Sequence, residues 1–183
     1  MTRSRVWRSQ VGALFAVVAL TSAAFVPSLA AHHGNVTVVD HGAAARIESQ
    51  FITLINDLRE RRGLPSLTLD PSLRERTCEW TATMVAQGKL QHDPNLASDI
   101  SWAEHSWTKG GENVGVGATV QSLFAAFVQS PRHLANLVEP VFNRLSVCVF
   151  LAPGRSLIYT TQRFVAVLPV YSPSSPAGGS SSF

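Results

Sequence analysis

Beyond its first thirty residues, the 183-residue sequence lacks an excess of charge of either sign. The net charge of +3 comes from Arg3, Arg5 and Arg8, because no acidic residue lies in that stretch and twelve bases and twelve acids follow it. Because the chain after residue 30 has equal numbers of bases and acids and no basic stripe, its charge gives no reason to expect nucleic-acid binding, although the pI is about 9.3.

Long apolar runs are missing after residue 31, so we expect no membrane span in the mature chain. The N-terminus differs, because its three arginines precede an apolar run over about 11–26 and the small residues Ser28 and Ala30. This order predicts a secretory signal peptide over residues 1–30 and a secreted or extracytoplasmic protein. The alternative is an uncleaved anchor, since residues 11–31 could just span about 30 Å of hydrocarbon as a helix.

Cysteine is scarce, with only Cys78 and Cys148 in the chain. Thiols in an oxidising compartment tend to pair, and this bridge would close a loop of about seventy residues, which the chain-entropy model values at roughly 4 kcal/mol. We therefore predict one intramolecular disulfide. Two separately buried thiols are the alternative, because the sequence does not show that the two Cα atoms approach within bonding distance.

Apolar periodicity is also missing at both ends of the remaining chain. Residues 31–43 are expected to form a flexible leader, and the Ser/Pro/Gly-rich residues 169–183 are expected to form a disordered tail. The segment 44–168 is long enough for one domain with its own core.

Within this domain, apolar residues at helical spacing predict a first helix over about 44–62. Asp70-Pro71 then pairs a capping side chain with proline at the first helical position. This pair predicts a second helix that continues to about Gln87 and ends at Gly88.

Residues 89–117 have no period and are rich in aspartate, proline and glycine, so we expect one long irregular connection there. Thr119 is expected to cap a third helix. Ser130-Pro131 is expected to cap a short fourth helix that ends near Val138.

The last part of the domain has a different composition, because residues 145–151 and 157–165 are rich in β-branched and aromatic side chains. Pro153-Gly154-Arg155 separates these runs, which predicts a β-hairpin. Helices first and strands late, without alternation of the two, indicate an α+β domain built in layers.

Three side chains of metal-ligand type stand out in and after the expected irregular connection: His92, Glu112 and His133. Two imidazoles and one carboxylate are the ligands of a zinc site with an open position, although a lone loop histidine is more often solvated. Since His133 would lie in the first turn of a helix, the helix dipole disfavours its imidazolium form. The neutral imidazole that remains is the form that binds a metal.

Short motifs occur in a specific order between about Ile47 and Val165. They are Asn56-Asp57-Leu58-Arg59, Leu69-Asp70-Pro71-Ser72-Leu73, Leu90-Gln91-His92, Gly111-Glu112-Asn113-Val114, Ser130-Pro131-Arg132-His133 and Thr161-Gln162-Arg163-Phe164. In this combination they resemble the bacterial type of the CAP superfamily, the cysteine-rich secretory and pathogenesis-related proteins that carry an SCP domain.

The resemblance implies a three-layer α-β-α sandwich with a small antiparallel sheet. It also implies a cleft that holds two histidines and acidic residues, often with a divalent metal, for which zinc is the expected ion. By position, the ligands would be His92, Glu112 and His133. A second glutamate of many animal and plant members has no clear counterpart here, so the resemblance implies a lower metal affinity.

Four polar residues are expected to support this cleft. Asn56 and Arg59 are interpreted as a structural bracket from the first helix, and Asn113 and Ser130 flank the expected ligands. Ser130 is not favoured as a nucleophile, because a capping hydroxyl is committed to backbone amides and His133 is only three residues away.

The leading hypothesis for function is a secreted binding module, expected to be a monomer, whose cleft coordinates a metal or a small polar group and whose neighbouring apolar surface takes a lipid or a partner protein. The alternative is a metal-assisted hydrolase, a peptidase or esterase, in which Glu112 takes a proton from a metal-bound water. The chain lacks a His-Glu-x-x-His helix or another dedicated hydrolase signature. A third hypothesis makes the polar cluster structural, with His92 and Glu112 tying the connection to the body by a bond of roughly 1.5 to 3 kcal/mol.

Overall fold

The computed structural model describes residues 41–152 and 157–168. The expected signal peptide, nearly all of the expected leader, the expected tail and the Pro153-Gly154-Arg155 turn lie outside the described residues. No helix in the two described ranges is both long enough and apolar enough to cross a membrane.

Helix α1 spans His41–Glu60, so it begins three residues before the expected start at Ala44 and includes the end of the expected leader. Its apolar residues recur at helical spacing and bury Phe51 and Ile55 completely. Gly63 follows the helix with a φ of +69°, in the left-handed region that favours glycine at helix ends.

Helix α2 spans Pro71–Gln87 and has the predicted ends. The Asp70 carboxylate accepts hydrogen bonds from the backbone N–H groups of Ser72 and Leu73, and Gly88 ends the helix in the left-handed region. The buried face of α2 contains the threonines Thr77 and Thr81 as well as the apolar residues Leu73 and Met84.

The region 89–117 contains a helix and a long strand, so the expectation of one irregular connection is wrong. Helix α3 spans Leu96–Ala103 and strand β2 spans Trp107–Gly117. Strand β2 has few β-branched residues, but it pairs along its length with strand β4, Ile158–Val167. Pairing with a strand far away in the sequence therefore outweighs the weak local preference.

Helices α4 and α5 have the predicted order and nearly the predicted bounds. Helix α4 spans Val120–Gln129, and its predicted cap, Thr119, accepts a hydrogen bond from the backbone N–H of Ser122. Helix α5 spans Pro131–Leu137, but the Ser130 side chain accepts no capping hydrogen bond, so that part of the prediction is wrong. The proline in the first turn lacks an N–H, which removes one of the donors that a cap would satisfy.

The four-stranded sheet has the order β1-β3-β4-β2. Strand β3, Arg144–Leu151, pairs antiparallel with β4, which confirms the predicted pairing of the two late strands. Strand β1, Thr68–Leu69, was not predicted and pairs in parallel with β3, so the sheet is mixed rather than wholly antiparallel.

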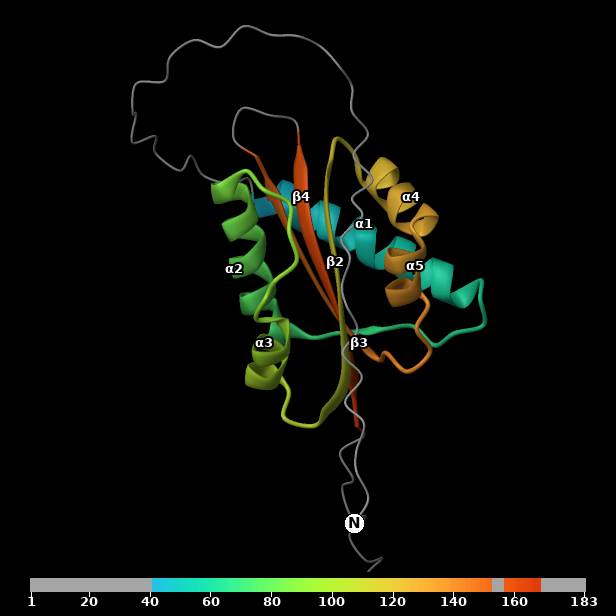
Figure 1. The fold of residues 1–183 in the computed structure, drawn as a ribbon. Coiled ribbons are helices and arrows are strands. Elements are labelled where there is room, and N and C mark those ends of the chain that lie inside the picture. The colour runs from blue at the N-terminus through green and yellow to red at the C-terminus, as the bar shows by residue number, and fades with distance from the viewer. Residues whose placement is uncertain (1–40, 153–156, 169–183) are drawn as a thin grey trace, which may run out of the picture. The chain divides into compact units, whose positions relative to one another are not determined.

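The sheet lies between two layers of helices, as Figure 1 shows: α1, α4 and α5 cover one face, and α2 and α3 cover the other. This arrangement confirms the expected α+β class and the three-layer sandwich. The main core lies between the sheet and the layer of α1, α4 and α5, and includes Phe51, Ile55, Phe127, Leu145 and Phe164. Two smaller apolar clusters lie on the side of α2 and α3.

Candidate functional site

His92 and Glu112 lie together, as the sequence predicts for two members of the candidate site. His92 belongs to the segment between α2 and α3, which is anchored by a 3.1 Å hydrogen bond from the Trp80 indole Nε1 to the Gln91 carbonyl. The His92 Nδ1 atom lies 2.9 Å from Glu112 Oε1, and 62% of the His92 side chain is exposed. With Nδ1 engaged, Nε2 is the nitrogen that remains for a ligand.

The Glu112 carboxylate is held from several sides. Oε1 also accepts a hydrogen bond of 3.0 Å from the backbone N–H of Asp93, and Oε2 accepts one of 3.4 Å from Arg163 Nε. Only 2% of the Glu112 side chain is exposed. Glu112 is therefore better placed to orient the His92 ring than to serve as a free ligand or base.

Arg163 lies at the centre of this polar cluster and is fully buried. Its guanidinium forms ion pairs with Asp93, with Asp99 at 2.8 Å and with Glu112. Burial raises the pKa of Asp93, whereas its hydrogen bond from the Asn95 backbone and the charge of Arg163 act in the opposite direction. Three carboxylates around one cation leave a local excess of negative charge next to His92 when all three are ionised.

His133 lies in the first turn of α5, and its ring contacts Phe127 edge-to-face with 5.0 Å between the ring centroids. Burial lowers the pKa of His133, and the charge of His92 lowers it further. Both effects favour the neutral imidazole, which is the metal-binding form.

Two asparagine side chains connect β2 to α5 beside His133. Asn113 Nδ2 donates a hydrogen bond of 3.3 Å to the His133 carbonyl. Asn136 Nδ2 donates to Asn113 Oδ1 at 2.9 Å and to the Glu112 carbonyl at 3.1 Å. Asn113 therefore positions α5, which carries His133.

The strand character of β2 determines how these groups meet. Successive side chains of a strand point to opposite faces, so Glu112 faces Arg163 while Asn113 faces α5. Because β2 lies at the end of the strand order, the contacts of Glu112 with His92 and of Asn113 with α5 lie at this edge of the sheet.

The three expected ligands do not form a compact group. In the described ranges, a single set of three potential metal ligands has its ligand atoms all within 4.8 Å of one another, and that set is Glu48, Cys78 and Cys148. The structure thus joins His92 to Glu112, without bringing the ligand atoms of His92, Glu112 and His133 all within 4.8 Å of one another.

Two hollows lie elsewhere on the domain. One, of about 290 Å³, is lined by residues of α1 and α4, and the other, of about 120 Å³, lies beside β3 and the start of α2. Neither is lined by His92, Glu112 or His133.

Asn56 and Arg59 hold backbone segments, as expected for a structural bracket. Asn56 exchanges two hydrogen bonds with the backbone of Leu67. Arg59 is fully buried, and its guanidinium donates hydrogen bonds to four backbone carbonyls, those of Pro65, Leu137, Glu139 and Phe142.

Sequence reasoning missed the roles of Asp93, Asp99, Arg163 and Asn136. One signal was present, because Arg163 stands alone as a charge in a strand of otherwise uncharged residues. A charged side chain in a buried strand requires a partner. The partners of Arg163 lie 51 to 70 residues earlier in the chain, so the sequence does not identify them.

The profile of the CAP family, described as the cysteine-rich secretory protein family, matches residues 52–164. The chain belongs to the CAP family. No curated protein matches the sequence.

Solved structures resemble the CAP domain over 67% of the chain. An outer surface protein from Borrelia burgdorferi has a TM-score of 0.62 at 15% identity, and 94% of that chain is covered. An extracellular protein with an SCP domain from Bacillus anthracis has a TM-score of 0.58 at 22% identity, and a cysteine-rich secretory protein from Staphylococcus aureus has 0.55 at 17%. The CAP domain spans only 41% and 39% of the latter two chains. At these sequence identities the structural similarity is evidence for the fold alone.

Proposed function

We propose that this protein is an exported CAP-domain binding module that holds a divalent metal between the imidazoles of His92 and His133, with zinc as the expected ion. The observation that carries the proposal is the His92 ring, whose Nδ1 is fixed by the buried Glu112 carboxylate at 2.9 Å while much of the ring is exposed. Histidine ligands of metals commonly make this bond to a carboxylate through their second ring nitrogen.

The charges around His92 support cation binding. Asp93, Asp99 and Glu112 surround the cation Arg163, so the cluster carries negative charge in excess when all three carboxylates are ionised. A cation at His92 Nε2 would offset that excess. Two neutral imidazoles without a free carboxylate ligand should hold zinc weakly and leave coordination positions open.

The hydrogen bonds that both carboxylate oxygens of Glu112 already accept favour a binding module over a hydrolase. A base that takes a proton from a metal-bound water needs an oxygen within reach of that water. Both oxygens of Glu112 already have partners, and its side chain is almost wholly buried. The open metal positions would instead accept an anionic group, such as a lipid phosphate or a carboxylate of a partner protein.

Export is supported by three independent features. The sequence predicts a signal peptide, the two cysteines form a disulfide, and the resembling structures are described as outer-surface, extracellular and secretory proteins. Disulfides persist mainly in such oxidising compartments.

The metal proposal is tested by thermal unfolding of the purified protein at pH 7.5 with increasing zinc. A ligand that binds only the native state at 100 times its Kd stabilises by about 2.7 kcal/mol. For a domain of this size that corresponds to a rise in Tm of roughly 5–10 °C. We expect the rise in the wild type and its loss in His92→Ala and in His133→Ala.

His105→Ala is the matched control, since it removes an exposed imidazole that has no part in the Arg163 cluster. It should keep the full zinc shift. An unchanged Tm of the wild type at millimolar zinc, or an equal shift in His92→Ala, would contradict the metal proposal and leave the cluster with a structural role.

A further inference from the structure

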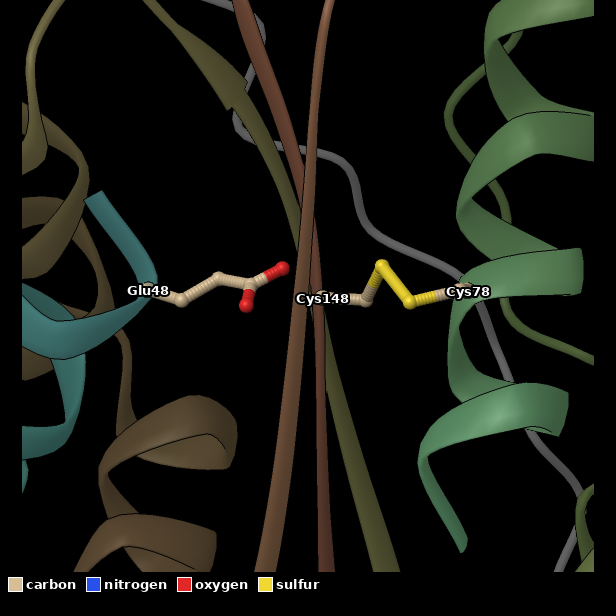
Figure 2. Close-up of side chains that lie close together, drawn as sticks. All are labelled: Glu48, Cys78 and Cys148. Carbon is tan, nitrogen blue, oxygen red and sulfur yellow. A yellow bond between two sulfur atoms is a disulfide. The ribbon is translucent and has the colours of Figure 1, made fainter. Parts of the chain in front are cut away.

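A second group of potential metal ligands lies away from His92, towards the opposite edge of the sheet. The Cys78–Cys148 disulfide joins α2 to β3, with a Cα–Cα distance of 5.1 Å. Glu48 approaches from α1, and Figure 2 shows its carboxylate and the disulfide on the two sides of the strand ribbon that carries Cys148. One ligand atom from each of the three residues lies within 4.8 Å of the other two, and β4 separates this group from β2 in the strand order.

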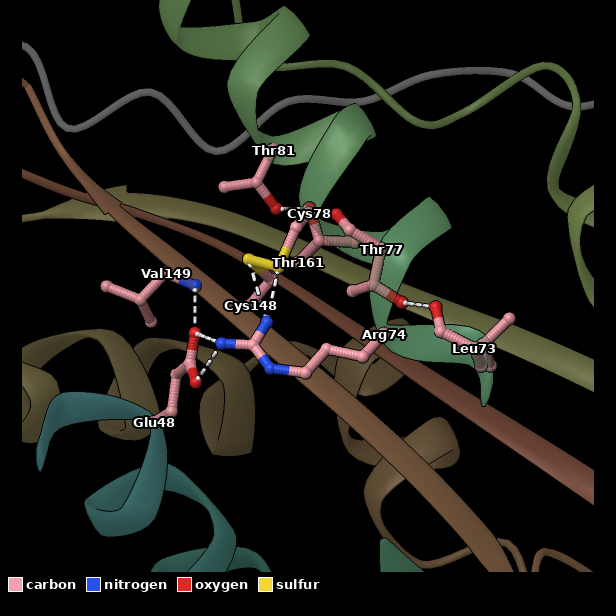
Figure 3. The surroundings of a disulfide bond; sticks show 9 residues. All are labelled: Glu48, Leu73, Arg74, Thr77, Cys78, Thr81, Cys148, Val149 and Thr161. Carbon is pink, nitrogen blue, oxygen red and sulfur yellow. Dashed lines mark hydrogen bonds and ion pairs between the residues drawn. A yellow bond between two sulfur atoms is a disulfide. The ribbon is translucent and has the colours of Figure 1, made fainter. Parts of the chain in front are cut away.

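The group already holds a cation. Arg74 Nη1 lies 2.6 Å from Cys78 Sγ and 3.8 Å from Cys148 Sγ, while Nη2 donates to the two oxygens of Glu48 at 2.8 and 3.1 Å (Figure 3). The guanidinium therefore contacts every member of the group. Solvent reaches this cation, because 49% of the Arg74 side chain is exposed.

Two of the groups around this cation are more deeply buried than the cation itself. Glu48 is 8% exposed, and its Oε1 also accepts a 3.0 Å hydrogen bond from the backbone N–H of Val149. Cys148 is 1% exposed. A hollow of about 120 Å³, lined in part by Glu48 and Arg74, lies beside them.

The chemistry of the group depends on its oxidation state. A dithiol or phosphine reductant transfers two electrons to the S–S bond, which breaks and takes up two protons to give two thiols. A metal ion then displaces both protons, because the thiolate is the ligand form. Two thiolates, one carboxylate and one water complete the four-coordinate geometry that zinc adopts.

We propose that in the reduced protein Cys78, Cys148 and Glu48 form a zinc site in which the metal replaces the Arg74 guanidinium. The site and the disulfide exclude each other, since the same two sulfur atoms make both. Zinc bound here keeps the thiols from oxidising, and oxidation releases the zinc. The proposal is independent of the site at His92.

The test is an anaerobic titration of the full chain with cobalt, after reduction by a phosphine, followed by displacement with zinc. We expect a thiolate-to-cobalt absorption band in the near ultraviolet that saturates with one cobalt at this group, with no band in oxidised protein. Cys78→Ser and Cys148→Ser should each abolish the band. His92→Ala should leave it unchanged, which separates this site from the imidazoles.

Two variants test the role of the charged neighbours. Glu48→Gln removes the third ligand and should weaken cobalt binding by at least about tenfold. Losses of that size occur even when a residue that only hydrogen-bonds to a metal ligand is replaced. Arg74→Gln removes the competing cation and should tighten binding. If Arg74 instead served only to stabilise a thiolate, its loss would weaken binding, and this outcome would overturn the proposal.

Circular dichroism of each reduced sample keeps the test decisive. If the reduced chain is folded, the cobalt affinity read from the band should differ between wild type and Glu48→Gln. Equal affinities would mean that the two thiolates hold the metal without Glu48, and the proposal fails. If the reduced chain is unfolded, zinc must restore the native spectrum in the wild type, and failure to restore it overturns the proposal.

Discussion

Two fully buried arginines show how the same residue type has different roles in this domain. Arg163 pairs with carboxylates, whereas Arg59 donates to four neutral backbone carbonyls. Burial lowers the pKa of Arg59, and the charge of Glu139 partly opposes this effect. Arg59 joins α1 to the segments before β1 and after α5, so its contribution should be to stability.

At the residue scale, we predict that Arg59→Ala lowers the free energy of unfolding by about 3–5 kcal/mol. Each buried carbonyl left without a partner costs about 1–3 kcal/mol, and water can re-enter to replace only some of the bonds. Urea denaturation of the oxidised protein measures this loss. Arg61→Ala, at an exposed position of the same segment, should stay within about 0.5 kcal/mol of the wild type. A similar midpoint for both variants would refute the bracket role.

At the scale of elements, the contact between β2 and α5 positions His133. Gly111 makes a close approach possible, because a Cβ atom there would lie 2.5 Å from Asn136 Oδ1 and 3.1 Å from Phe142 Cζ. Asn136 in turn holds the Glu112 carbonyl and Asn113 Oδ1. The lack of a side chain at Gly111 therefore lets the strand that carries Glu112 pack closely against the helix that carries His133.

We predict that Gly111→Ala destabilises the domain by about 1–3 kcal/mol, since overpacking pushes the helix away from the strand. It should also reduce the zinc-dependent rise in Tm, because α5 carries His133. Thr108→Ala, an exposed position of the same strand, is the matched control and should change neither quantity. In an Asn136→Ala background the cost of Gly111→Ala should fall, and an unchanged cost would show that the collision with Asn136 is not the cause.

At the scale of the whole domain, the disulfide connects the helical layer of α2 to the sheet across a separation of 70 residues. It also confirms the pairing predicted from the two cysteines. The helix and the strand that it joins are already packed together, so the bond acts mainly by limiting the unfolded chain.

We predict that reduction of the wild type, with a chelator present, lowers the free energy of unfolding by about 2–4 kcal/mol. Urea denaturation with and without reductant measures the difference. The Cys78→Ser/Cys148→Ser double variant should match the reduced wild type within about 1 kcal/mol and should not respond to reductant. A urea midpoint that is equal before and after reduction would contradict this account.

The sequence by itself determined the features that depend on neighbours along the chain. The ends of α2 follow from Asp70, Pro71 and Gly88, whose effects act within one turn. The apolar and β-branched patterns likewise predicted α1, α4 and the pair β3 and β4, and the motif order indicated the CAP family. The pairing of His92 with Glu112 came from the resemblance to that family rather than from spacing.

Only the tertiary structure decided the features that depend on distant segments. Strand β2 is a strand because β4 pairs with it, although its own residues favour a loop. The carboxylates around Arg163 and the carbonyls around Arg59 come from segments up to 83 residues away, so no local pattern points to them. Local sequence specifies helix ends because capping energies are local, whereas buried charges take their partners from wherever the fold brings chain segments together.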